Sequence, residues 1–118
     1  MFQFLATHDL ASLDLGEPSA KPASIDCEQL EAAVELWRSS DGLMKIGVWE
    51  CTPGRFSANR EAASETCHFI SGRVTLHNAD GTSRDLGAGD LLVLPQGWTG
   101  EWTIQEKTRK LYVMHTAG

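Results

Sequence analysis

Long apolar runs are missing from this 118-residue chain. A membrane-spanning helix needs roughly 20 consecutive apolar residues, and no stretch of the sequence approaches that length. The opening residues, MFQFLATHDLASLDL, lack a basic segment, and their apolar run is too short for a secretory signal peptide. We therefore expect no membrane partner and a cytoplasmic location.

Positive charge is scarce. The chain has 10 Lys and Arg residues against 16 Asp and Glu residues, which gives a formal net charge of −6. Nucleic acids are recognised first by clustered basic residues, and the one short cluster, Lys107–Lys110, is interpreted as solvated charges on a strand. The composition therefore predicts no nucleic-acid partner.

Paired metal ligands and common catalytic motifs are also missing. The three cysteines form no CxxC motif and are expected to be reduced, with a packed pair of Cys51 and Cys67 weighed against a soft-metal or redox role. No two histidines are spaced i, i+2 or i, i+4, so each is expected on a surface or sheet face: His8, His68, His77 and His115. No Ser-His-Asp arrangement, phosphate-binding glycine loop or zinc-finger spacing is found.

The sequence has instead many short strand signals. From residue 43 onward, segments rich in β-formers alternate with turns at TPG, Ser71-Gly72, ADG, GAGD and PQG. They are LMKIGVWEC, ETCHFI, RVTLHN, TSRDL, LLVL, WTGEWTI and TRKLYVMH. Seven or more short strands without a convincing helix between them predict an all-β sandwich or barrel.

The chain is long enough for one domain only. Residues 1–30, which include LGEPSAKPAS, show little periodicity and are predicted to form an irregular N-terminal arm on the barrel or on a partner subunit. Residues 31–118 are predicted to form the barrel. Residues 28–38 are ambiguous, because Leu30, Val34 and Trp37 have helical spacing whereas SSDG is a hairpin-type turn.

Four stretches carry a family resemblance: GVWECTPGRF, SETCHFISGRVTLHNADG, LGAGDLLVLPQG and EWTIQEKTRKLYV. They resemble the cupin superfamily, in particular the small single-domain group related to the ethanolamine-utilisation accessory cupin and to ureidoglycine aminohydrolase. The resemblance implies a double-stranded β-helix (jelly roll) that is often dimeric and has a pocket inside the barrel. It also favours a strand rather than a helix for residues 33–38.

The same resemblance has a consequence for metal binding. Metal-binding cupins supply two histidines and a glutamate from a first motif and a third histidine from a second. The glutamate corresponds to Glu65, but the first two histidine positions fall near residues 58–59 and 60–61, and the third falls at Gly100. Since at most one standard ligand remains, we expect no metal in the usual place and no other cofactor.

Strand alternation then predicts which side chains line the pocket. If Gly100 faces the barrel interior, Trp98, Trp102 and Ile104 share that face. By the same rule Cys67 and Phe69 share the inner face with Glu65, whereas Thr66, His68 and Ile70 point away. We hypothesise that Trp102 replaces the metal centre as the floor of an aromatic-lined cavity.

Glu65 is the candidate catalytic residue, as a general acid or base; the alternative is a rim glutamate in a hydrogen bond. Lys110 shares one face of the last strand with Tyr112 and can pair with Glu65 or lie outside the barrel. Glu61 is placed in a loop over the pocket mouth. The predicted ligand-binding set is Glu65, Cys67, Phe69, Trp98, Trp102, Lys110 and Tyr112.

Three functions remain open at this point. The first is a metal-independent binder of a small, partly apolar molecule in a metabolic context. The second is a lyase, isomerase or hydrolase that uses Glu65 or a non-standard metal. The third is a structural homodimer with a closed barrel. A homodimer is expected in each case, and fold alone does not choose between them.

Overall fold

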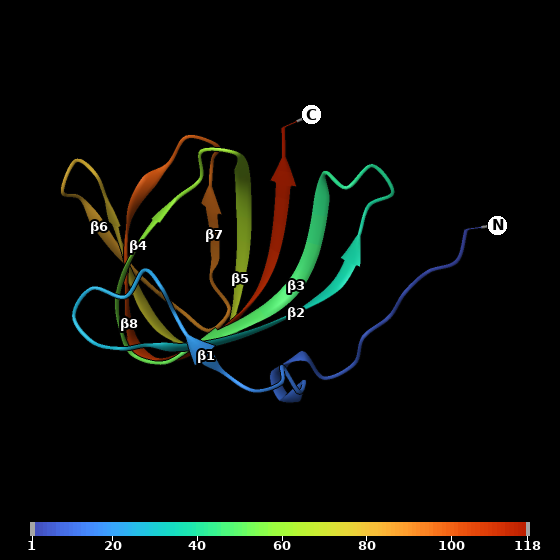
Figure 1. The fold of residues 1–118 in the computed structure, drawn as a ribbon, viewed down its shortest axis with the longest axis horizontal. Helices are drawn as coiled ribbons and strands as arrows, with labels where there is room; N and C mark the ends of the chain where they lie inside the picture. Colours follow the sequence, from blue (N-terminus) through green and yellow to red (C-terminus); the bar gives the residue numbers. More distant parts are fainter. Residues whose placement is uncertain (1, 118) are drawn as a thin grey trace.

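A computed structural model describes residues 2–117, and strands dominate it (Figure 1). A short 3-10 helix, η1 (Leu10–Ser12), precedes the barrel. The strands are β1 (Ser19–Ala20), β2 (Leu30–Arg38), β3 (Met44–Cys51), β4 (Gly54–Asn59), β5 (Ala63–Asn78), β6 (Ser83–Gly87), β7 (Leu91–Leu94) and β8 (Thr99–Thr116). The prediction of an all-β jelly roll is confirmed.

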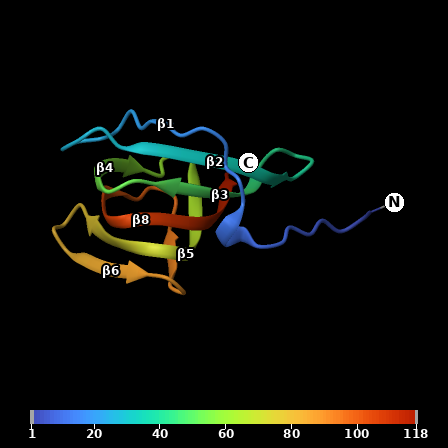
Figure 2. The ribbon, with the colours of Figure 1, turned by 90° about the horizontal axis from the view of Figure 1, so that it is seen from below.

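Two long strands, β5 and β8, pair with each other and run through both layers of the barrel. The first half of β5 and the second half of β8 lie in one layer with β1, β2, β3 and β7. Their other halves lie in the second layer with β4 and β6. Figure 2 shows β2, β3, β8, β5 and β6 following one another across the molecule.

The sequence divides each of these long strands into two, and that division is wrong. Ser71-Gly72 was expected to be a turn between strands, but β5 continues through it with register shifts between Phe69 and Val74. Gly72 has φ 96, and a Cβ there would collide with Thr108, so glycine is required. The turn signal therefore marks the bend that carries β5 from one layer to the other.

The ambiguous segment is a strand. β2 pairs antiparallel with β3 from Glu31 opposite Cys51 to Arg38 opposite Lys45. A register shift between Glu35 and Trp37 places one extra residue in β2, which explains why its apolar residues do not follow a strict period of two. The hairpin turn at residues 39–42 leads directly into β3, as the SSDG signal indicated.

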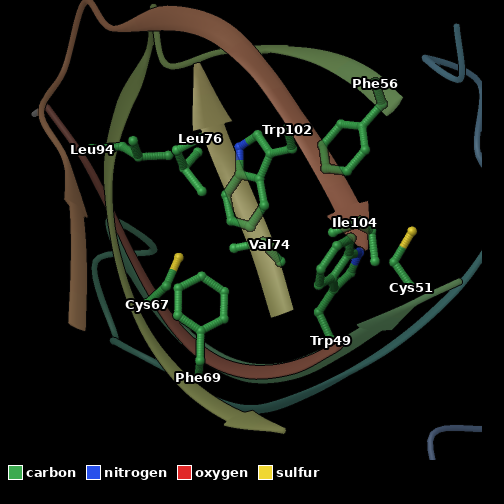
Figure 3. Close-up of a cluster of buried hydrophobic side chains, with 10 residues drawn as sticks. All are labelled: Trp49, Cys51, Phe56, Cys67, Phe69, Val74, Leu76, Leu94, Trp102 and Ile104. Atoms are coloured by element: carbon green, nitrogen blue, oxygen red, sulfur yellow. The ribbon is translucent and has the colours of Figure 1, made fainter. Parts of the chain in front are cut away.

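The core lies between the two layers and is rich in aromatic rings (Figure 3). Trp102, the largest fully buried side chain, stacks on Phe56 with ring centroids 5.6 Å apart and meets the edges of Trp49 and Phe69. The alternation of burial along β5 confirms that Glu65, Cys67 and Phe69 face inward, whereas His68 is exposed. One end of this core opens onto the candidate site.

The N-terminal arm lies against the barrel from η1 onward. Arg109 donates hydrogen bonds to the carbonyl oxygens of Leu10 and Leu13 at 2.7 and 2.9 Å. β1 pairs with the start of β2, and Ser24 forms a bridge with Phe56. Residues 2–9 extend away from the barrel (Figures 1 and 2). Within residues 2–117, no helix has the length and apolar character needed to cross a membrane.

Candidate functional site

A buried carboxylate held by two cations lies at one end of the barrel. Glu65 on β5 is 3% exposed. Its Oε2 accepts a hydrogen bond of 2.8 Å from Lys110 Nζ on β8, and its Oε1 accepts bonds of 2.9 and 2.5 Å from Arg60 Nε and Nη2. Arg60 precedes β5 by three residues, so the strand entrance brings the guanidinium group to the carboxylate. Both oxygens of Glu65 are therefore already engaged.

Lys110 is also held by aromatic faces. Its ammonium group lies 4.3 Å from the ring centroid of Trp102 and 4.4 Å from that of Trp49. Such cation–π contacts become stronger when water is excluded, and Lys110 is buried. Trp102, Ile104 and Lys110 are all buried on β8, although residues 105–107 between them are exposed and the pairing with β5 shifts register in this stretch.

The two cations determine the charge of Glu65. Burial alone would raise the pKa of this carboxyl group, but the attraction of Lys110 and then of Arg60, with their hydrogen bonds, lowers it from 4.5 to about 2. Glu65 is thus a carboxylate across the physiological range. This state suits an ion-paired structural or recognition group and does not suit a general acid, which must carry a proton.

A cavity of about 220 Å³ opens beside this ion pair. We call it the mouth cavity, and it is lined by Lys21, Ala33, Lys45, Trp49, Phe56, Arg60, Glu65, Trp102, Lys110, Tyr112 and Met114. The lining comes from the arm, from both layers and from the loop before β5. Its volume is below the roughly 300–1,000 Å³ of pockets for drug-sized ligands, so it suits a small metabolite.

The position of the third histidine is filled by another side chain. A Cβ on Gly100 would collide with the carbonyl oxygen of His77 and with the indole ring of Trp98. Trp98 packs against the core, and its Nε1 donates a hydrogen bond of 2.8 Å to Asn78 Oδ1, which fixes the ring over Gly100. A histidine therefore cannot be accommodated at position 100 without moving Trp98 and the β5 backbone.

The residues present do not fit a transition metal of the kind that cupins bind. The resemblance implies a first-motif histidine position near residues 60–61, and the guanidinium group of Arg60 there cannot ligate a metal because it has no lone pair to offer. Glu65, the remaining ligand, is neutralised by two cations. In the part of the chain from residue 2 to 117, no three His, Cys, Asp or Glu side chains are grouped to hold a metal ion.

Four members of the predicted ligand-binding set come together at the mouth cavity: Glu65, Trp102, Lys110 and Tyr112. Cys67 and Phe69 lie deeper, in the hydrophobic core. Trp98 lines a separate groove with β7 residues. Trp102 is inside the barrel and forms one wall of the mouth cavity, as its hypothesised role requires. Ligand binding by any of these residues stays a prediction.

Other candidates lie away from the mouth cavity. Glu61 is exposed in the loop between β4 and β5. Cys51 and Cys67 are both buried free thiols, and Cys27 is an exposed one. Burial raises the pKa of Cys67 to about 12, which makes it a poor nucleophile. His77 bonds Thr103 Oγ1 through its Nε2 at 2.9 Å.

Three cationic residues of the mouth cavity, Lys21, Lys45 and Arg60, were missed by sequence reasoning. Arg60 was visible in principle, because it lies near a position where the family resemblance implies a histidine. Lys45 is the second residue of β3 and shares the inward face with Trp49 by alternation. Lys21 lies in the irregular arm, where no periodicity indicates a direction.

The architecture defines the class of protein: a single jelly-roll barrel with a buried, ion-paired glutamate, Glu65, inside it. The family model for the EutQ-like cupin domain matches residues 38–112. The chain therefore belongs to the EutQ-like cupin family. No protein with a curated description matches the sequence.

Solved structures give the same result for the fold. A DUF861-family protein of unknown function from Pseudomonas syringae pv. tomato is 27% identical, with a TM-score of 0.76, over 90% of this chain and 46% of that one. The EutQ protein of Clostridium difficile is 19% identical, with a TM-score of 0.65, over 75% of this chain and 64% of that one. A putative ethanolamine utilization protein Q from Salmonella typhimurium is 18% identical, with a TM-score of 0.65, over 86% of this chain and 98% of that one.

The matched proteins differ in how much of their length this chain covers. This chain spans 46% of the Pseudomonas protein and 64% of the Clostridium protein. The two EutQ structures are only 19% and 18% identical to this chain, so their similarity supports the fold and nothing further.

Proposed function

We propose that this protein is a metal-independent binding module for a small metabolite, which occupies the mouth cavity. The observation that carries the proposal is the combination of a small open cavity with a Glu65 carboxylate that two cations already neutralise. A ligand-binding role needs an accessible cavity with a few fixed polar groups among aromatic walls, and the mouth cavity has both.

The two other functions receive less support. An acid–base enzyme needs a Glu65 that gives and takes a proton near neutral pH, whereas Lys110 and Arg60 hold its pKa at about 2. A closed structural barrel needs a packed interior, whereas the mouth cavity leaves space beside Trp49 and Trp102. Each argument favours binding over the alternative it addresses.

A cavity-filling substitution tests the proposal. Ala33 lines the mouth cavity, and its neighbour Ala32 points to the opposite face of the same strand. An indole added by Ala33→Trp fills the cavity without changing any charge, and Ala32→Trp is the matched control. Isothermal titration calorimetry against a metabolite panel, with a chelator present, measures binding.

We expect the panel to yield a ligand whose binding persists in the chelator, is abolished by Ala33→Trp and is retained by Ala32→Trp. Binding that requires an added divalent metal would contradict the metal-independent role. Binding that survives Ala33→Trp would place the ligand elsewhere on the molecule.

A further inference from the structure

The mouth cavity has a charge opposite to that of the protein. The whole chain carries a formal net charge of −6. Yet the charged residues that line the cavity are four cations, Lys21, Lys45, Arg60 and Lys110, and one carboxylate, Glu65. A positive cavity in an acidic protein concentrates small anions locally, because low-dielectric walls focus the field.

Most of these cations have a partner within the protein. Lys21 Nζ bonds Glu31 Oε1 at 3.0 Å, and the same oxygen accepts a bond of 2.9 Å from Trp49 Nε1. Arg60 and Lys110 share the single charge of Glu65. One positive charge around Glu65 is therefore left without a matching negative charge.

Lys45 is the cation without a bonded partner. It is half-buried at the start of β3, and across residues 2–117 its ammonium group makes no hydrogen bond or ion pair. Glu35 lies close enough to attract it, but both Glu35 oxygens bond Arg38, at 3.2 and 2.7 Å. Three N–H donors of Lys45 are thus available at the cavity wall.

The cavity offers donors and almost no acceptors. Both oxygens of Glu65 and the bonding oxygen of Glu31 are engaged. A ligand that supplies acceptors and negative charge can pair with the free donors of Lys45, whereas the net positive lining disfavours a cationic ligand.

We propose that the mouth cavity binds a small organic carboxylate, with Lys45 as the principal charge partner; this inference rests on the proposed binding function. The carboxylate accepts charge-assisted hydrogen bonds from Lys45, and its apolar body contacts the rings of Trp49, Phe56 and Trp102. A carboxylate fits better than a phosphate group. Phosphate is commonly held by backbone N–H groups or a free arginine fork, and here Arg60 is occupied by Glu65 and by the carbonyl oxygen of Asn59.

Matched pairs of charged and neutral probes test this inference. Benzoate and butanoate are titrated by calorimetry at low salt, together with benzamide and butanamide, which have nearly the same shape without the charge. The protein variants are Lys45→Gln and, as a control, Lys107→Gln, since Lys107 lies at the exposed surface beside Glu50. Inorganic phosphate is titrated as a second anion.

We expect the carboxylates to bind about tenfold or more tightly than their amides. Lys45→Gln is expected to raise the dissociation constant of the carboxylates by a similar factor and to leave that of the amides unchanged, while Lys107→Gln changes neither. The inference is overturned if the amides bind as tightly as the carboxylates, if both lysine variants behave alike, if phosphate alone binds, or if no carboxylate binds at millimolar concentration. A neutral metabolite that Ala33→Trp excludes would preserve the binding function while refuting the carboxylate.

Discussion

Lys110 Nζ lies 2.8 Å from Glu65 Oε2 in the barrel interior, and both side chains are less than a tenth exposed. In metal-binding cupins the equivalent glutamate faces a metal ion, as the family resemblance implies. Here an ammonium group and the guanidinium group of Arg60 supply the positive charge instead. The internal carboxylate of this barrel thus has protein cations as its counterions.

The first prediction concerns the removal of one partner from this pair. Lys110→Met leaves Glu65 with Arg60 alone and is expected to lower the free energy of unfolding by about 3–5 kcal/mol, the usual cost of breaking a buried ion pair. Urea denaturation followed by tryptophan fluorescence measures the change. Lys107→Met, at an exposed site, is the control and should change the free energy of unfolding by less than about 1 kcal/mol. Equal losses of unfolding free energy in the two variants would show that the buried ion pair contributes no more than an exposed one.

The second prediction is a dependence of stability on pH. Glu65 has a folded pKa of about 2 against an ordinary value of 4.5. Its contribution is therefore complete above the unfolded pKa and is lost as pH falls through the folded pKa. Between about pH 5 and pH 2 the wild type is expected to lose about 3 kcal/mol that Glu65→Gln does not lose.

Urea unfolding of both proteins at a series of pH values gives this difference directly. Parallel curves for wild type and Glu65→Gln would mean that the pKa of Glu65 is not lowered by folding.

The third prediction concerns the thiols. Burial raises the pKa of Cys51 to about 11 and that of Cys67 to about 12, whereas Cys27 is exposed. A thiol reagent at mildly alkaline pH is expected to label Cys27 in the native protein and all three cysteines after denaturation. Mass spectrometry of the labelled peptides identifies the sites. Rapid native labelling of Cys67 would indicate that the barrel interior opens readily.

The fourth prediction concerns the backbone at Gly100. A methyl group added by Gly100→Ala meets the His77 carbonyl oxygen and the Trp98 ring, so we expect a loss of about 1–3 kcal/mol in the free energy of unfolding. Gly87→Ala is the matched control, because the space beside that strand glycine is wider and its φ is not positive. Chemical denaturation of both variants measures this loss. An unchanged free energy of unfolding in Gly100→Ala would show that the Trp98 ring moves aside without cost.

The fold was predictable because it depends on signals that repeat along the chain. Turn residues bounded the strands, and alternation gave the correct inward faces for Glu65, Cys67 and Trp102. The lengths of β5 and β8 were not predictable in the same way. A glycine at a bend and a glycine at a chain reversal have the same local signature, and only pairing with other strands distinguishes them.

The mouth cavity was predicted only in part. Glu65 and Trp102 lie on regularly alternating parts of their strands, so alternation placed them on the inward face. Whether Lys110 faced Glu65 or the exterior was left open, because sheet pairing across 45 residues cannot be derived from local patterns. The position of Lys21 could not be predicted from the sequence, because its direction depends on how the N-terminal arm packs.

The two long strands also determine how this barrel comes apart. Because β5 and β8 each contribute to both layers, neither layer contains a complete set of strands of its own. Unfolding of one layer removes half of each long strand and exposes the apolar inner face of the other layer to water, so a half-unfolded state is unfavourable. The chain should consequently lose its structure in one cooperative transition, and the barrel end that holds Glu65 should melt together with the end that holds Gly100.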